Sequence, residues 1–166
     1  MRSGASPRRR VRPPRRSRGK AVRAAGVVLV TLAALAAPAA AEFRSVEAPA
    51  AVLYDAPSRA AKPVAVVSRH YPVELVVVTE GWVKVRDHTG ALSWLERRLL
   101  AERRTVLVTA ASAPVRERPE DAAPVVFFAA QNVALERLEA GPVGWLRVRH
   151  VDGASGFVRS AAVWGD

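Results

Sequence analysis

The hydrophobic and polar positions of the chain follow two different patterns. Residues 24–37 form one long, mostly apolar run, AAGVVLVTLAALAA, which Pro38 ends. After residue 41 the apolar runs become short, and some alternate with polar residues at a period of two, as in Trp82–Arg86. Gly, Pro and Asp residues separate these runs, and none of them has the longer period of an amphipathic helix. The pattern predicts one N-terminal apolar helix followed by an all-β chain.

Several short strands are predicted between residues 52 and 108, because β-branched runs there are divided by turn residues. A 3₁₀ or helical turn is expected at 96–100. The strands are predicted at 52–54, 64–67, 73–79, 82–86, 92–95 and 106–108. Strands of this length and spacing are typical of a small β-barrel.

A second copy of the same pattern follows about 63 residues later. The segment Gly81–Arg86 lies over Gly144–Arg149 at that shift, and Trp94 lies over Phe157. Further upstream the shift falls to 60–62, because loops differ in length, with the larger change at 139–143. We therefore predict two tandem barrels. The predicted divisions are a lead-in at 42–50, a first barrel at 51–110 and a second barrel at 111–166.

The repeated motifs resemble those of bacterial SH3-like (SH3b) domains. They comprise a Leu53–Ser58 entry strand (LYDAPS), Gly-Trp-x-x-Val, a glycine turn, an aromatic-aliphatic pair and the run Leu99–Val108. Together with the terminal Val163–Gly165, they are similar to exported two-copy SH3-domain proteins. The resemblance implies a five- to six-stranded barrel in each copy and a non-catalytic binding role, often suggested to be at the cell wall. The second copy departs from the pattern at its entry, 113–119, where the tyrosine is lost.

The charge of the chain is concentrated at its N-terminus. The sequence has 26 Lys and Arg against 15 Asp and Glu, a formal net charge of +11. Ten of the basic residues and none of the acidic residues lie in 1–41, which leaves 16 basic against 15 acidic side chains in 42–166. This near-neutral remainder argues against a protein that binds nucleic acid.

Residues 1–41 have the three zones of a secretory signal peptide. A basic segment runs to Arg23, the apolar run follows, and Pro38 precedes Ala39-Ala40-Ala41, a small-residue cleavage signal. We expect cleavage near Ala41, with export by the general or the twin-arginine route. An uncleaved anchor is the alternative, but the apolar run falls short of the roughly 20 residues that a spanning helix needs. The predicted location is periplasmic or secreted, with membrane contact only through the signal peptide.

The available residue types give little support for catalysis. The chain has no cysteine, which excludes a Cys-His hydrolase. The histidines His70, His88 and His150 lie in separate predicted loops, without the spacing of a zinc site. We therefore predict a protein that is not an enzyme and has no catalytic residue, metal site or cofactor.

Matching strands of the two copies carry the candidate binding residues. If His88-Thr89 is a two-residue hairpin loop, Val83 and Val85 face Trp94 and Leu92 across the hairpin, and this apolar side forms the core. The candidate binding residues on the opposite side are Trp82, Lys84 and Arg86 in the first copy and Trp145, Arg147 and Arg149 in the second.

The faces of the partner strand in each hairpin depend on the length of the hairpin loop. In the second copy, the same loop length puts Leu146, Val148, Ser155 and Phe157 inside, and Gly156 and Val158 outside. A three-residue loop would exchange the two faces of the partner strand.

Two interpretations of these residues are open. In the first, Trp82 and Trp145 stack on a sugar or peptide while the four cations attract carboxylates of an envelope polymer. In the second, the tryptophans pack against a neighbouring strand or the other barrel, with the basic stems lying over them. Tyr54 is a further candidate contact, with no counterpart in the second copy.

The sequence therefore favours an exported, non-catalytic binding module for a cell-envelope ligand such as peptidoglycan or its stem peptides. The alternative is a periplasmic structural or adaptor protein that binds another protein through its barrels. The predicted partner is accordingly a cell-wall polymer or a periplasmic protein.

Overall fold

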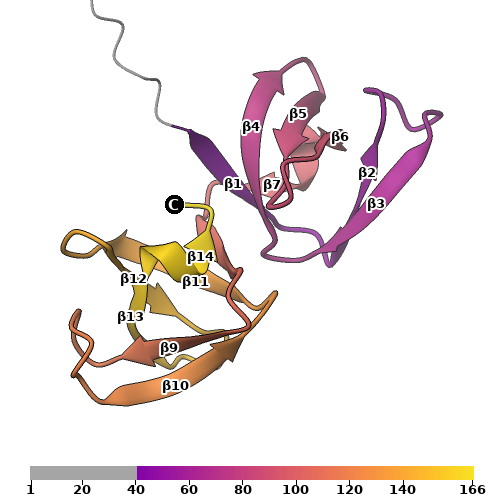
Figure 1. Ribbon diagram of the computed structural model, residues 1–166. Helices are drawn as coiled ribbons and strands as arrows, with labels where there is room; N and C mark the ends of the chain where they lie inside the picture. The colour runs from indigo at the N-terminus through magenta and orange to yellow at the C-terminus, as the bar shows by residue number, and fades with distance from the viewer. Residues whose placement is uncertain (1–40) are drawn as a thin grey trace, which may run out of the picture. The chain divides into compact units, whose positions relative to one another are not determined.

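A computed structural model describes residues 41–166 of the chain. The predicted signal peptide, apart from its last residue, lies outside the described residues. Residues 42–164 form two seven-stranded antiparallel sheets, which we call the first and the second barrel (Figure 1). Within the described range, no helix is long and apolar enough to cross a membrane.

The first barrel has the strand order β3-β2-β6-β5-β4-β1-β7. The single-turn 3₁₀ helix η1 (Arg97–Leu99) lies where a short turn was predicted. The strands are β1 (Glu42–Val46), β2 (Ala50–Tyr54), β3 (Pro63–Ser68), β4 (Pro72–Val78), β5 (Trp82–Arg86), β6 (Leu92–Glu96) and β7 (Leu100–Ala101).

The second barrel repeats this topology with the order β10-β9-β13-β12-β11-β8-β14. A second 3₁₀ helix, η2 (Ser160–Ala162), precedes its last strand. The strands are β8 (Thr105–Val108), β9 (Ser112–Arg116), β10 (Val125–Ala130), β11 (Ala134–Ala140), β12 (Trp145–Arg149), β13 (Ser155–Arg159) and β14 (Val163–Trp164). The prediction of two tandem all-β units is confirmed.

The boundary between the barrels differs from the predicted one. Strand β1 falls in the expected lead-in, yet it pairs with β4 and β7 of the first sheet. Strand β8, expected to close the first barrel before residue 110, pairs instead with β11 and β14 of the second. The boundary therefore lies at 102–104. Pairing across the sheet decides this, and local strand pattern carries no information about which sheet a strand joins.

The hairpin loops contain three residues rather than two. Trp82 pairs with Glu96 and Val85 with Ser93, so the loop is 88–90. The backbone nitrogen of Gly90 donates to the Asp87 carbonyl oxygen, and its φ of 88° requires glycine. The Asp87 side chain accepts from the backbone nitrogens at 89 and 91. These turn hydrogen bonds fix the longer loop, and the partner strands therefore have the opposite faces from those first assigned.

The exchange of faces is visible in the burial of the partner strands. Ser93 and Leu95 lie inside the first barrel, and Leu92 and Trp94 lie on its outer side. In the second barrel Gly156 and Val158 lie inside, whereas Phe157 is only partly buried on the outer side. The assignment of Ser155 and Phe157 to the core was therefore wrong, while that of Val83, Val85, Leu146 and Val148 was right.

Each barrel has its own apolar core, built from alternate residues of its strands. In both cores valine is the commonest residue, as expected for short strands packed on one face. The first core contains Val46, Ala51, Leu53, Val73, Val83, Val85 and Leu95. The second contains Val106, Val108, Ala113, Val115, Ala129, Leu135, Leu146, Val148 and Val158.

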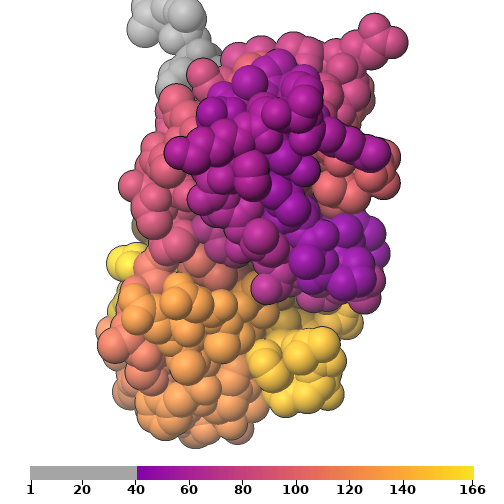
Figure 2. Space-filling view, turned by 90° about the vertical axis from the view of Figure 1, so that its right-hand side faces the viewer, coloured from indigo at the N-terminus to yellow at the C-terminus, as the bar shows by residue number. Residues whose placement is uncertain are grey.

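The strands β3 and β10 are the outer strands of the two sheets, each paired on one side only. Neither carries a charged residue, and both leave apolar side chains exposed: Val66 is 67% exposed and Phe128 69%. In Figure 2, the side of the first barrel that carries β2 and β3, coloured purple, faces the viewer. Native proteins usually protect such edges with charges, so these two strands are unusual surface features.

Candidate ligand-binding site

Each candidate tryptophan follows a glycine at the start of a strand. Gly81 and Gly144 have φ values of 79° and 83°, a conformation that favours glycine. The carbonyl oxygen of each glycine accepts a backbone hydrogen bond from the turn after the partner strand, at Arg97 and Ser160 respectively. This bond fixes the corner of the hairpin, and it brings Trp82 or Trp145 next to the end of β6 or β13.

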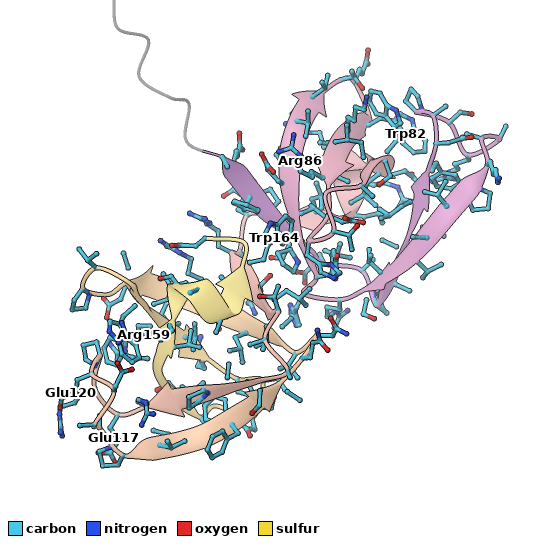
Figure 3. The ribbon with its side chains drawn as sticks, in the orientation of Figure 1. Trp82, Arg86, Glu117, Glu120, Arg159 and Trp164 are labelled. Atoms are coloured by element: carbon cyan, nitrogen blue, oxygen red, sulfur yellow. The ribbon has the colours of Figure 1, made fainter. Side chains whose placement is uncertain are left out.

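In the first barrel, Trp82 is partly exposed on the outer side of β5 (Figure 3). The Tyr54 ring packs edge-to-face with it, with the ring centroids 5.7 Å apart. Trp82 lines a cleft of about 510 Å³ between the loop after β2 and the end of β6. The lining residues are Pro57, Ser58, Arg59, Gly81, Trp82, Glu96 and Arg98.

Two arginines share one carboxylate at the rim of this cleft. Arg59 donates to Glu96 through Nε and Nη2, at 3.0 and 2.7 Å. Arg98 donates to the same carboxylate through Nε, at 2.9 Å. The Glu96 side chain is 15% exposed, whereas those of Arg59 and Arg98 are 64% and 65% exposed. The hydrogen bond from Arg59, reinforced by Arg98, lowers the pKa of Glu96, so this carboxylate is ionised at neutral pH.

In the second barrel, the chain itself covers the equivalent tryptophan. The Arg159 guanidinium lies over the Trp145 ring, 4.2 Å from its centroid, and Trp145 is only 5% exposed. Arg159 also forms a bidentate pair with Asp121, which lies in the loop between β9 and β10. This hydrogen bond lowers the pKa of Asp121. Figure 3 shows Arg159 at this end of the second barrel.

The two sites are related by a reversal of charge. Glu96 and Arg159 occupy equivalent positions on β6 and β13, opposite Trp82 and Trp145 in the ladders. Their partners Arg59 and Asp121 occupy the equivalent loop. Each barrel therefore joins loop and strand with an ion pair, but among the described residues a cation lies over the indole ring only in the second barrel.

Most of the predicted cations lie beside acidic residues on the neighbouring strand. Arg86 pairs with Glu74, Arg147 with Glu139 and Arg149 with Glu136, each through contacts of 2.7–3.0 Å. Lys84 lies opposite Trp94 in the ladder. The alternation of β5 and β12 predicts the outward position of these cations but says nothing of the carboxylates on the neighbouring strands β4 and β11.

The structure thus brings together Trp82 and Tyr54, but surrounds them with Arg59, Arg98 and Glu96, which sequence reasoning missed. Arg59 lies in a loop, and Glu96 and Arg98 lie around the end of β6. A usable signal existed, because a shift of 63 residues places the acidic Glu96 over the basic Arg159. The counterpart of Tyr54 is Arg116, which donates to the Ala123 carbonyl oxygen inside the second barrel's loop.

The histidines take part in separate local contacts. His88 Nδ1 lies 2.6 Å from the Tyr71 hydroxyl, and His150 lies 3.0 Å from Asp152. Burial raises the pKa of Tyr71. Within residues 41–166, no group of three or more His, Asp or Glu side chains is arranged to hold a metal ion.

The family model of the bacterial SH3 domain matches the chain twice, over residues 47–102 and 109–165. These matches cover more than half of the chain. The chain therefore belongs to the bacterial SH3 domain family, which confirms the resemblance found in the motifs. Domains of this family are usually non-catalytic binding modules.

Among solved structures, the chain is similar to NlpC2 and NlpC1 from Trichomonas vaginalis and to an NlpC/P60 family protein from Bacillus cereus. Identity to NlpC2 is 16%, with a TM-score of 0.35 and coverage of 75% of this chain and 47% of that chain. The values for NlpC1 are 16%, 0.34, 75% and 45%. Those for the Bacillus cereus protein are 17%, 0.36, 74% and 56%. The chain spans about half the length of these proteins, and no curated protein matches it.

Proposed function

We propose that this chain is an exported, non-catalytic binding protein that recognises peptidoglycan or its stem peptides through the Trp82 cleft of the first barrel. Export rests on the zones of residues 1–41, with a predicted periplasmic or secreted location. The binding role is consistent with the family, whose domains typically bind cell-wall material.

The observation that carries the proposal is the partly exposed Trp82 in an open cleft with two exposed guanidiniums at its rim. Indole faces stack on sugar rings and peptide groups, and guanidiniums bind carboxylates. Peptidoglycan offers all of these groups within one repeating unit. The cleft lies on the outer side of the barrel, where a long polymer has access to it.

A sacculus pull-down tests the proposal with purified residues 42–166. Trp82→Ala should abolish most of the binding, because it removes the stacking surface without opening the core. Trp145→Phe is the matched control, since it keeps the buried packing of the second barrel, and it should bind like the parent. Thermal unfolding of each variant verifies folding. A folded Trp82→Ala variant that binds sacculi as well as the parent protein would contradict the proposal.

The exposed edge strands favour one further candidate function, an adaptor that binds a periplasmic protein. An extended segment of a partner can add to β3 or β10, whose outer edges are unpaired in their sheets. The exposed Val66 and Phe128 would then contact the partner's side chains.

Crosslinking in cells distinguishes this candidate from the first. A photo-crosslinker placed at Val66 or Phe128 should recover one stoichiometric protein partner if the chain is an adaptor. The same probe on Lys84, outside both edges, serves as the control. Recovery of glycan fragments alone, or of no defined protein, would count against the adaptor function.

A further inference from the structure

We infer that the Trp82 cleft recognises a free carboxylate attached to an apolar group, and that the equivalent place in the second barrel is filled by the chain's own Arg159. Each chain therefore has one such site. The inference rests on the proposed function and assigns the ligand chemistry and the stoichiometry of that site.

The charges at the rim of the cleft favour an anion. Arg59 and Arg98 contribute two cations and Glu96 one anion, so the lining has one uncompensated positive charge. Glu96 is already engaged by three N–H groups from the two arginines. A ligand cation would have to compete with both guanidiniums for this carboxylate, whereas a ligand anion adds to the network.

The hydrogen bonds leave suitable donors for a carboxylate. Arg98 uses only its Nε towards Glu96, and Arg59 uses Nε and Nη2. Within residues 41–166, neither Nη group of Arg98 nor the Nη1 of Arg59 has a hydrogen-bond partner, and both side chains line the cleft. A guanidinium presents its donors as a planar fork that matches the two oxygens of a carboxylate.

Trp82 supplies the apolar half of the site. Its ring borders the same cleft as the two arginines, so a ligand that contacts both must carry its carboxylate close to an apolar or planar group. The terminal D-alanine of a peptide has the required combination, a methyl group beside a free carboxylate.

The second barrel shows what closes this kind of site. Arg159 lies against the Trp145 ring and is held there by Asp121. A cation over an indole face is attracted by the ring's π electrons. Glu96 at the equivalent position has no such attraction to Trp82. Its carboxylate accepts hydrogen bonds from Arg59 and Arg98 instead. Trp82 is partly exposed at the cleft, where a ligand can contact it.

Titration with a soluble probe tests the ligand chemistry. N-acetyl-D-alanyl-D-alanine should perturb the Trp82 indole resonance in an NMR titration, and its C-terminal carboxamide should bind at least tenfold more weakly. Arg98→Gln should cause a similar loss for the acid and little change for the amide. The control Arg118→Gln, an exposed arginine of the second barrel that pairs with Glu120, should change neither. Equal affinity for acid and amide would overturn the inference.

Two further measurements separate this inference from the proposed function. Sacculi whose carboxylates have been amidated should lose binding to the parent protein. Trp82-dependent binding that survives amidation would leave the proposed function intact and overturn the carboxylate inference. The triple variant Asp121→Arg, Arg159→Glu and Ala161→Arg reproduces the three charged residues of the first cleft, since Ala161 is the counterpart of Arg98. It should open Trp145 and raise the number of probe sites from one to two. A folded triple variant that still has one site would refute the closure by Arg159.

Discussion

The two barrels share a topology but differ in what covers their tryptophans. Trp82 and Trp145 follow equivalent glycines and start equivalent strands. One is partly exposed in a cleft, and the other is 5% exposed beneath Arg159. The two sites differ in sign at the ladder position of Glu96 and Arg159 and at the loop position of Arg59 and Asp121. The two copies therefore share the frame of the site, while the reversed ion pair places a cation over the indole in the second barrel.

The largest expected effect concerns the partner strand in the core. A side chain added at Gly156 would place a Cβ 2.5 Å from the Arg116 carbonyl oxygen and 2.9 Å from a Val115 methyl group. Gly156→Ala should therefore lower the free energy of unfolding by about 2 kcal/mol through overpacking. The equivalent residue of the first barrel is the buried Ser93, which already has a Cβ.

Denaturant unfolding measures this difference. The matched variant Ser93→Ala should cost less than about 1 kcal/mol, because it adds no volume. An equal cost for the two alanine variants would show that the two cores tolerate a side chain at this position alike, contrary to the packing of Gly156.

The next largest effect should come from covering Trp82 with an arginine, in the way that Arg159 covers Trp145. Arg59→Asp with Glu96→Arg places a cation next to Trp82 and an anion in the loop, as in the second barrel. Binding of sacculi should weaken about tenfold, which corresponds to about 1.4 kcal/mol. The single variant Glu96→Gln, which leaves both arginines in place, is the control. Undiminished binding by the folded double variant would mean that an arginine at this position does not cover Trp82.

A smaller effect is expected for the cross-strand ion pairs, which the two barrels share. Glu74→Gln removes the partner of Arg86, and Glu136→Gln removes the partner of Arg149. Each variant should lose less than about 1 kcal/mol of stability, because these pairs are solvent-accessible. Glu136→Gln should cost slightly more, since Glu136 also lies 3.9 Å from Arg103. Chemical denaturation at low and high salt measures the effect, and a loss that is independent of salt would contradict an ion-pair origin.

The smallest effect is a pH dependence of the cover over Trp145. Arg159 lowers the pKa of Asp121 below its ordinary value of 3.8 through a hydrogen bond, with the charge of Arg116 acting in the same direction. The pair is therefore intact above about pH 4 and is lost as the pH falls through the lowered value. The Trp145 indole resonance should be constant from pH 7 to pH 5 and shift only in stronger acid. Asp121→Asn should remove this transition, and an unchanged transition would assign it to another group.

Only part of the candidate site could be predicted from the sequence. In β5 and β12, buried valine or leucine residues alternate with the other side chains. This alternation predicted that Trp82 and Trp145 lie on the outer side of their strands. The roles of Arg59 and Arg98 did not follow, because a loop residue meets the end of a strand only through tertiary contact. The pairing of Arg86, Arg147 and Arg149 with acidic residues required the registers of β4 with β5 and of β11 with β12, which contain a bulge in each barrel.

The sequence by itself determined the all-β class, the duplication and the membership in a family, because strand alternation, turn residues and repeated motifs are local features that are read along the chain. The tertiary structure decided the barrel boundary, since β1 and β8 take their place from long-range pairing. It also decided the loop length, the partner-strand faces and the cover of Trp145 by Arg159. These features depend on hydrogen bonds and charges brought together from distant positions, where one residue of register or one change of sign alters the surface.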